Sequence, residues 1–382
     1  MKITENVPLS ELTTMRLGGP ARFLIEIETK DDIPEAYEFA KSHNLPTFIL
    51  GGGANTIARD EGFPGIIFKN TMCGISEVND QKSLFEGPPE RGSARMSAPR
   101  PWQTAPWDAD DPKGRRAEAT QPEKRLFGHL TIMGGTPWDS VVEYACERGL
   151  TGIEAMSKIP GTAGAAPVQN IGAYGQDISQ TLDNIEVYDS TTGKFKTLTN
   201  SDLHFSYRHS LLNTTEKDRY FVISITLKLH PGELSRPFYN SIEQYITDHH
   251  ETDFSPKNIR RIVSTIRENK LPDPTTTPSA GSFFKNIYLT EKQAKEAEAN
   301  HIPVYHGHDG FKINSGWLIE NAGLKGKLLH GIRVSDKAAL VLINESAKSY
   351  QDLAAARTEI INAVKTKFGF HLEQEPVELW KS

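Results

Sequence analysis

Three short stretches combine side chains that could move a proton or stabilise negative charge. Ser282 stands in GSFFKN, after Gly281 and ahead of two phenylalanines, a lysine and an asparagine. It could be a turn residue at the start of an apolar strand, or a proton donor in a lined pocket. Arg208, in FSYRHS, offers a planar guanidinium to a carboxylate or an oxyanion, although a lone arginine is ordinarily a solvated charge. The tail, residues 372–379, carries Glu373 and Glu375, which would also ordinarily be solvated.

A glycine-rich stretch, GGGANT, could hold an anion. Gly51, Gly52 and Gly53 directly follow an apolar run, and consecutive glycines let backbone amides converge on a phosphate without side-chain clashes. The stretch is not GxGxxG, because Thr56 occupies the last glycine position, and it is not a P-loop, because no GK[ST] follows. A tight turn at a strand end is the equally weighted alternative.

A second stretch of small residues, IPGTAGAAPVQNIGAYG, covers 159–175. A helix or strand built for stability would not use this much glycine. A plain loop of this composition would be costly to order, because its backbone loses much freedom on folding. We therefore interpret the stretch as a surface that lies against a flat or phosphorylated ligand.

Apolar periodicity predicts the elements that must position these stretches. Strands are predicted over 23–27, 47–50, 63–68 and 222–229, together with a hairpin of 185–188 and 194–198. One helix is predicted over 33–43. A second should begin at Thr136, its cap, and end at Gly149, and a third should cover 353–368 and end at Gly369. Residues 80–125 have no apolar period, which predicts a disordered insert; a functional lid is the less favoured alternative.

Composition and charge argue against several classes of protein. The 382 residues, of which 37% are hydrophobic, suit one large or two to three modest domains. The net charge of −6 gives no reason to expect nucleic acid or an anionic membrane as a partner. No apolar run approaches a membrane span, and MKITENVPLSEL lacks the layout of a signal peptide. Cys73 and Cys146 form no CxxC, which argues against a disulfide framework or a metal site. We expect a cytoplasmic monomer.

These stretches, in this order, resemble one family. LGGGANTIARDEGFPGIIFKN, GIEAMSKIPGTAGAAPVQNIGAYGQDI, FSYRHSLL, KLPDP, GSFFKN, GWLIENAGLKG and the LEQE of the tail are similar to motifs of the UDP-N-acetylenolpyruvoylglucosamine reductase (MurB) family. The resemblance spans nearly the whole chain except about 80 to 125. It implies an α+β fold, with a two-part FAD-binding module of the vanillyl-alcohol-oxidase/PCMH type and a C-terminal α+β substrate domain. The implied limits are 1–70 and 71–235 for the two FAD-binding subdomains and 236–382 for the substrate domain.

The resemblance also implies a reaction. It implies FAD and NADPH as cofactors, UDP-N-acetylglucosamine enolpyruvate as substrate, and UDP-N-acetylmuramate, a peptidoglycan precursor, as product. Hydride from the flavin N5 would add to C3, Arg208 and Glu373 would stabilise the enolate, and Ser282 would give a proton to C2. One residue is inserted after Glu375, which leaves Glu375 open as the alternative to Glu373.

The family's binding residues map onto two further sets of positions. FAD contacts are expected at Gly51, Gly52, Gly53, Ala54, Asn55, Thr56, Ile159, Gly161, Thr162, Gly164, Asn170, Gly172, Ala173, Tyr174 and Gly175, and substrate contacts at Tyr207, Tyr239, Lys270, Asn286 and Asn321. Ala54 stands where the family usually has serine, but backbone amides can still bind a phosphate there. Two other functions stay open: an FAD-linked oxidase of the same fold acting on another substrate, and a catalytically inactive flavin or nucleotide-sugar binding protein.

Overall fold

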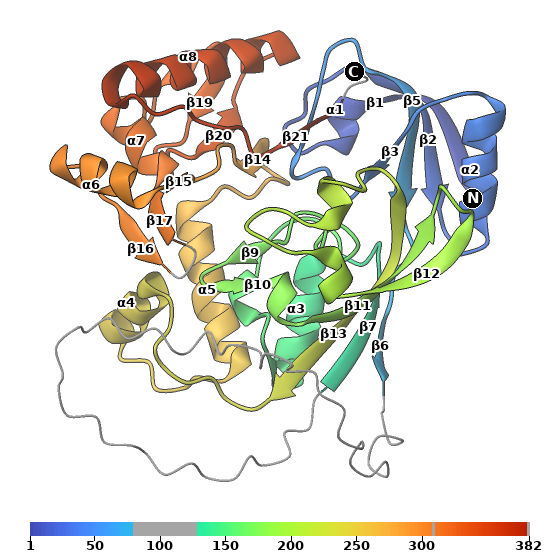
Figure 1. Ribbon diagram of the computed structural model, residues 1–382, viewed down its shortest axis with the longest axis horizontal. Coiled ribbons are helices and arrows are strands. Elements are labelled where there is room, and N and C mark those ends of the chain that lie inside the picture. Colours follow the sequence, from blue (N-terminus) through green and yellow to red (C-terminus); the bar gives the residue numbers. More distant parts are fainter. Residues whose placement is uncertain (79–127, 308–309, 380–382) are drawn as a thin grey trace. The chain divides into compact units, whose positions relative to one another are not determined.

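The computed structural model describes residues 1–78, 128–307 and 310–379 (Figure 1). The expected insert at 80–125 lies outside these residues. The chain divides into two compact units, one of Met1–Lys69 with Arg267–Ser382 and one of Asn70–Ile266. The domain limits implied by the resemblance stay a prediction. Within the described ranges, no helix combines the length and hydrophobicity that crossing a bilayer requires.

The first unit is built from both ends of the chain. Its elements are β1 (Lys2–Pro8), α1 (Leu9–Leu12), β2 (Pro20–Ile27), α2 (Asp32–Ser42), β3 (Thr47–Leu50), β4 (Thr56–Ala58), β5 (Phe63–Asn70), β14 (Ser279–Ser282), β15 (Ile287–Leu289), α6 (Glu291–Ala299), β16 (Tyr305–Gly307), β17 (Gly310–Ile313), α7 (Ser315–Asn321), β18 (Leu328–Leu329), β19 (Ile332–Val334), β20 (Val341–Asn344), α8 (Tyr350–Phe368) and β21 (Val377–Leu379). The sheets have the strand orders β1-β2-β5-β3, β14-β20-β19-β18, β15-β17-β16 and β21-β4.

Helix α8 shows why local sequence signals worked in this unit. Ser349 begins it with a capping box to Asp352, and Gly369 ends it with a left-handed φ of 76°, as predicted. Its apolar side, including Leu353 and Ile360, is buried in one core with α7 and the β14–β20–β19–β18 sheet. Figure 1 shows α8 running beside α7 and along this sheet. The predicted helix 33–43 and the strands over 23–27, 47–50 and 63–68 are confirmed as α2, β2, β3 and β5.

The second unit surrounds one antiparallel sheet of strand order β12-β11-β13-β7-β6, on which β8 pairs with β13. Its elements are β6 (Ile75–Val78), β7 (Gly128–Met133), α3 (Trp138–Glu147), β8 (Leu150–Thr151), η1 (Glu154–Met156), β9 (Gly172–Ala173), β10 (Gln176–Asp177), η2 (Ile178–Gln180), β11 (Leu182–Asp189), β12 (Lys194–Thr199), η3 (Ser201–Leu203), η4 (Leu211–Asn213), β13 (Tyr220–Pro231), α4 (Asn240–His249) and most of α5 (Pro256–Lys270). The predicted hairpin is confirmed as β11 and β12.

Helix α3 packs its apolar side, with Trp138 fully buried, against this sheet. The predicted cap was wrong by one residue. Pro137 is the N-cap, and Thr136 instead bonds its hydroxyl to the Gly74 backbone, accepting from the amide at 3.0 Å and donating to the carbonyl at 3.2 Å. A hydroxyl can bond to any nearby backbone group, and here a neighbouring segment competes successfully with the helix end.

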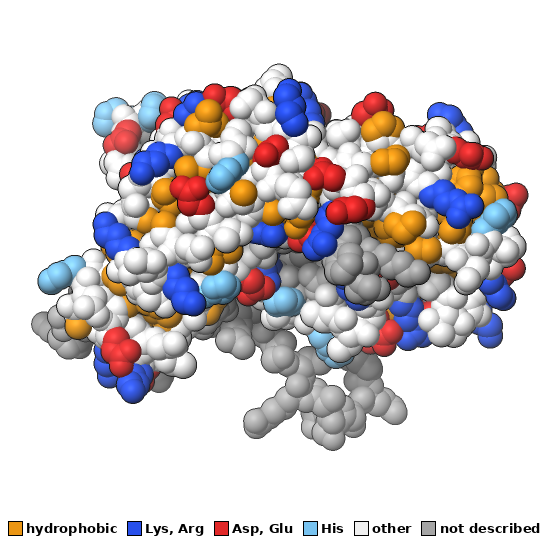
Figure 2. Space-filling view, turned by 90° about the horizontal axis from the view of Figure 1, so that it is seen from above, with side chains coloured by type: hydrophobic (Ala, Val, Ile, Leu, Met, Phe, Trp, Pro, Cys, Tyr) orange, Lys and Arg blue, Asp and Glu red, His pale blue; other side chains and the backbone are white. Residues whose placement is uncertain are grey.

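Asp189 and Glu154 are buried acidic residues of the second unit. On the face of the molecule drawn in Figure 2, by contrast, acidic and basic side chains are exposed and interspersed. Asp189, at the end of β11, has no exposed side-chain surface. Arg219 donates to it from Nε at 2.9 Å and from Nη2 at 2.8 Å, and Lys196 also contacts it. The Arg219 hydrogen bonds outweigh burial and hold the pKa of the Asp189 carboxyl well below its ordinary value of 3.8.

Replacing Asp189 by Asn should lower the free energy of unfolding by about 1.5–3 kcal/mol near neutral pH, because a neutral amide loses the charge-assisted hydrogen bonds from Arg219 and Lys196. Since the folded-state pKa is depressed, the wild type loses this stabilisation as the pH falls below 3.8, and the difference between the two proteins should narrow in acid. Urea unfolding over a series of pH values measures both effects. Asp183→Asn, at an exposed position of the same strand, is the control; a difference for Asp189→Asn that stays constant in acid would contradict the assignment.

Candidate active site

The glycine-rich loop 51–55 connects β3 to β4 in the first unit. Gly53 has a φ of +67°, and a Cβ on it would lie 2.0 Å from the carbonyl oxygen of Leu12, so a larger residue does not fit. Its own carbonyl accepts a hydrogen bond from the Thr14 amide at 3.2 Å. In the described part of the chain, the amides of residues 52–54 donate to no backbone carbonyl. They can therefore serve an anionic group such as a phosphate.

The second small-residue stretch lies in the second unit and begins beside the loop that precedes α3. Ala163 and Gly164 donate their amides to the carbonyls of Thr136 and Gly134, both at 2.8 Å. A Cβ on Gly164 would lie 3.0 Å from the Gly134 oxygen, so close packing favours glycine there. At Gly161 the φ of +120° requires glycine, while an added Cβ would meet no atom within 4 Å. The open space at Gly161 is room that a bound ligand could fill.

The stretch continues into a tight hairpin of β9 and β10. Tyr174 and Gly175 connect the strands with positive φ values of 49° and 85°, as in a two-residue type I′ turn. Asn170 precedes the hairpin with a φ of 47°, and its side chain holds the backbone. Its Nδ2 donates to the Ser206 carbonyl at 3.3 Å, and its Oδ1 accepts from the Ser179 amide at 3.1 Å.

A fully buried carboxyl, Glu154 in η1, supports this hairpin. Its Oε2 accepts from the amides of Gly152 at 2.7 Å and Ile153 at 3.1 Å. Its Oε1 accepts from the side-chain amide of Gln176 in β10, whose own oxygen accepts from the Ala155 amide at 2.8 Å. Burial raises the pKa of the Glu154 carboxyl, against the opposing effect of these hydrogen bonds. The amino-acid sequence does not reveal Glu154, because no spacing pattern distinguishes it from a solvated glutamate.

Arg208 lies beside the hairpin in the second unit, with a left-handed φ of 60°. Its Nη2 donates to the Gly172 carbonyl at 3.3 Å, and its guanidinium carbon lies 5.0 Å from the centre of the Tyr207 ring. Its own carbonyl accepts from the Asn213 side chain at 3.1 Å. A non-glycine residue keeps such a backbone conformation only where its surroundings impose it, and such residues cluster at functional sites.

The structure brings two predicted tyrosines together in the second unit. Tyr239, the N-cap of α4, is 49% exposed, and its ring meets the Tyr174 ring edge to face with centroids 5.7 Å apart. Lys270, the exposed last residue of α5, belongs to the first unit.

Ser282 is the last residue of β14 in the first unit and follows an irregularity in that strand. The register with β20 shifts between Ser279 and Ser282, and Gly281 within the shift has a φ of +68°. Such bulges bend a strand and change the direction of a side chain. Ser282 is exposed, whereas Phe283 and Phe284 are buried in the core. The residue thus presents an accessible hydroxyl next to a firmly packed segment.

The tail runs antiparallel to the residues that follow Ser282. Lys285 donates its amide to the Glu373 carbonyl at 2.9 Å, and Glu375 donates its amide to the Phe283 carbonyl at 3.0 Å. The Lys285 ammonium contacts the Glu373 carboxylate at 2.5 Å, although the Glu373 side chain is 71% exposed. Glu375 is partly buried. Both candidate glutamates therefore lie on extended backbone that pairs with residues 283–285, directly after Ser282.

The two asparagines predicted to bind substrate are held at opposite ends of α7. Asn286 accepts at its side-chain oxygen from the Ser315 amide at 3.2 Å. Asn321 donates its side-chain amide to the Trp317 carbonyl at 2.9 Å. These bonds account for their positions, and their role toward substrate stays a prediction.

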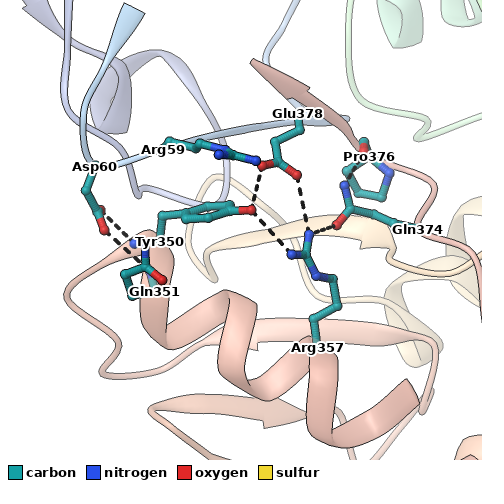
Figure 3. A network of polar contacts seen from close by, with 8 residues as sticks. All are labelled: Arg59, Asp60, Tyr350, Gln351, Arg357, Gln374, Pro376 and Glu378. Atoms are coloured by element: carbon teal, nitrogen blue, oxygen red, sulfur yellow. Dashed lines mark hydrogen bonds and ion pairs between the residues drawn. The ribbon is translucent and has the colours of Figure 1, made fainter. Parts of the chain in front are cut away.

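Sequence reasoning also missed a polar network around the tail, drawn in Figure 3. It joins Arg59 after β4, Tyr350 and Arg357 on α8, and Gln374 and Glu378 in the tail. Its members come from segments far apart in the chain, so no local pattern in a single sequence announces them.

Comparison with known proteins agrees with this architecture. The model of the UDP-N-acetylenolpyruvoylglucosamine reductase C-terminal domain matches residues 273–379, and that of an FAD binding domain matches 127–199. Reductases of that name from Aliivibrio fischeri and Alcanivorax borkumensis are 38% and 37% identical, over 98% of this chain and 94% and 96% of theirs. The crystal structure of MurB from Thermus caldophilus covers 100% of both chains, with a TM-score of 0.61 at 22% identity.

These matches confirm the expected fold class, an FAD-binding module followed by a C-terminal α+β domain, and FAD as a cofactor. The residues present fit that cofactor. The amides of residues 52–54 suit a phosphate, and the open space at Gly161 leaves room beside the backbone.

Gly53→Ala should lower the free energy of unfolding by more than the roughly 1–2 kcal/mol that a left-handed φ alone costs, because its Cβ would meet the Leu12 oxygen. FAD affinity should fall as well, since the loop must move. Gly149→Ala is the matched control, because Gly149 has the same φ of +67° but no atom within 4 Å of an added Cβ. Urea unfolding and titration of FAD by flavin fluorescence measure the two effects. Equal losses in both variants would rule out the close approach as the reason for glycine.

Proposed function

Because the chain belongs to the UDP-N-acetylenolpyruvoylglucosamine reductase family, we propose that it reduces UDP-N-acetylglucosamine enolpyruvate to UDP-N-acetylmuramate with FAD and NADPH. This is the activity of a UDP-N-acetylmuramate dehydrogenase. It supplies a precursor of peptidoglycan, and so serves cell-wall synthesis, cell shape and division. In this proposal the enzyme works in the cytoplasm as a monomer.

One arrangement in the first unit carries the proposal. Strand β4, which follows the glycine loop, pairs in parallel with β21 of the tail. Just before β21, the tail runs along the segment that follows Ser282. A candidate phosphate loop, a candidate proton donor and two candidate carboxylates therefore lie on adjoining segments. These are the groups that a flavin-dependent reduction of a polarised double bond needs.

When bound, FAD would supply the redox chemistry, the transfer of a hydride from NADPH by way of N5 to C3 of the enolpyruvyl group. The protein's part is to hold and orient. We propose that residues 51–56 and the expected contact positions between Ile159 and Gly175 hold FAD. Tyr207, Tyr239, Lys270, Asn286 and Asn321 are the proposed contacts of the substrate.

The remaining steps are a stabilised negative charge and a proton transfer. Arg208 offers a guanidinium to the enolate that develops on the substrate carboxylate, and Glu373 is the proposed acid that polarises the same carboxylate. Ser282 gives the proton to C2. A serine hydroxyl is a weak acid, so it needs positive charge nearby, and the Lys285 and Lys270 ammonium groups are the candidates.

Stopped-flow absorbance at the flavin band tests the proposed function directly. Protein reduced with NADPH is mixed with UDP-N-acetylglucosamine enolpyruvate in the absence of oxygen. Rapid return of the yellow colour supports the reductase. Return of colour only with oxygen would favour an FAD-linked oxidase, and protein that NADPH does not bleach would favour an inactive binding protein.

Ser282→Ala should leave flavin reduction by NADPH nearly intact and slow re-oxidation by substrate by about 10²–10⁴-fold, because the proton donor is lost. Single-turnover absorbance traces separate the two half-reactions. Ser42→Ala, which also removes an exposed hydroxyl of the first unit, is the control. Re-oxidation of Ser282→Ala at the wild-type rate would remove Ser282 from the reaction.

Glu373→Gln should slow re-oxidation by about 10²–10³-fold, because an amide cannot act as the acid that polarises the substrate carboxylate. Glu375→Gln is the matched comparison, two residues along the same strand, and should change the rate little. The same traces measure both variants. The reverse result would transfer the role to Glu375, and equal rates in both variants would exclude the tail carboxylates from this step.

A further inference from the structure

The tail is attached to the rest of the first unit at both ends. At its start, Glu373 and Glu375 share backbone hydrogen bonds with the segment after Ser282. At its end, β21 pairs with β4, and the Val377 amide donates to the Asn55 carbonyl at 2.9 Å. Between these attachments lies a turn through Pro376, which offers no amide hydrogen. Side chains hold the tail at this point.

Arg357 on α8 is the centre of that side-chain network (Figure 3). Its Nη1 donates to the side-chain oxygen of Gln374 at 2.6 Å and to Glu378 at 3.4 Å, and its Nη2 donates to the Tyr350 hydroxyl at 3.3 Å. Gln374 then donates its amide to the Pro376 carbonyl at 2.8 Å. The Arg357 guanidinium thus binds the tail on both sides of the turn, at Gln374 before it and at Glu378 after it.

Glu378 keeps this guanidinium in place. It accepts from Arg59 and from the Tyr350 hydroxyl, both at 2.5 Å. The side chains of Arg357 and Glu378 are 21% and 19% exposed, so their contacts are less screened than those of a surface pair. Burial would raise the pKa of the Glu378 carboxyl, but the bonds from Tyr350 and Arg59 lower it. The carboxylate therefore stays charged at neutral pH.

The hydrogen bond from Arg357 to Gln374 sets the directions of the Glu373 and Glu375 side chains. Gln374 bridges Phe284 in extended backbone, and its side chain faces Arg357 (Figure 3). Successive side chains of an extended chain lie on opposite sides, so Glu373 and Glu375 face away from Arg357. The contact of Glu373 with Lys285 agrees. A slip of one residue would turn Gln374 around and move both carboxylates to the other side.

We propose that Arg357 is a positioning residue that fixes the register of the tail by holding Gln374, and thereby places the tail carboxylates for the reaction. The proposal rests on the proposed function, because that function gives one of the carboxylates its role. Arg357 itself touches neither substrate nor flavin in this proposal. It applies whether Glu373 or Glu375 is the reacting group, since both flank Gln374.

The kinetic test compares Arg357→Met with Lys365→Met, which removes an exposed cation of similar length from the same helix. Arg357→Met should slow re-oxidation at saturating substrate by about tenfold to a hundredfold, the effect of a small misplacement of a reacting group. Flavin reduction by NADPH and FAD content should stay within about twofold of wild type. Arg357→Lys should be intermediate, because an ammonium can hold Gln374 but cannot fork to all three partners.

Gln374→Met removes the other side of the same contact and should behave like Arg357→Met. The double variant should be little worse than either single variant, because the two share one interaction. Equal rates for Arg357→Met and Lys365→Met would overturn the proposal. So would parallel losses in both half-reactions and in FAD content, which indicate general damage to the fold.

Amide hydrogen exchange tests, without substrate, whether Arg357 fixes the register of the tail. Arg357→Met should speed exchange at the Lys285 and Glu375 amides, which bond across the tail, by about tenfold or more, and Lys365→Met should not. Unchanged protection at these amides would overturn the proposal even if catalysis fell. If substrate failed to re-oxidise the wild-type protein, the proposed function would be contradicted. The exchange rates would still show whether Arg357 fixes the register of the tail.

Discussion

The pairing of β4 with β21 is the contact on which the first unit depends. It joins residues 56–58 to 377–379 in parallel, so the loop that precedes β4 and the tail that precedes β21 become neighbours. Three residues a side make a weak ladder alone. Buried Ile57 and Leu379, and the Arg59–Glu378 ion pair, reinforce it. The same pairing that stabilises the unit also assembles its candidate site.

The second unit prepares its candidate residues in a different way, through backbone conformation. Asn170, Tyr174 and Arg208 all have left-handed φ values, which residues other than glycine rarely adopt. Hydrogen bonds hold two of them there: Asn170 bonds through its side chain to Ser206 and Ser179, and Arg208 bonds to Asn213 and Gly172. A strained backbone that is held so firmly moves little when a ligand arrives, which favours precise orientation.

Sequence could predict what local spacing controls. The apolar period of α8 and its terminal Gly369 gave the helix and its end, and the glycines of the two small-residue stretches indicated loops that approach other groups closely. It could not predict that Thr136 bonds to Gly74, because two acceptable partners compete there and only packing decides. The bulge before Ser282 and the buried Glu154 depend on neighbours in space, and so does the Arg357 network.

The first unit is interrupted by the second, and this discontinuity sets an order of assembly. The described residues between 70 and 266 form a sheet and a hydrophobic core of their own, so this unit can fold as it leaves the ribosome. The segment 1–69 has its own sheet but must wait for residues 267–382 before β4 meets its partner. The glycine loop is therefore synthesised early, but the strand after it, β4, gains its partner β21 only when the end of the chain has been made. Until the tail emerges, the nascent chain presents an open strand edge at β4, which is a surface for chaperones and also one for mispairing.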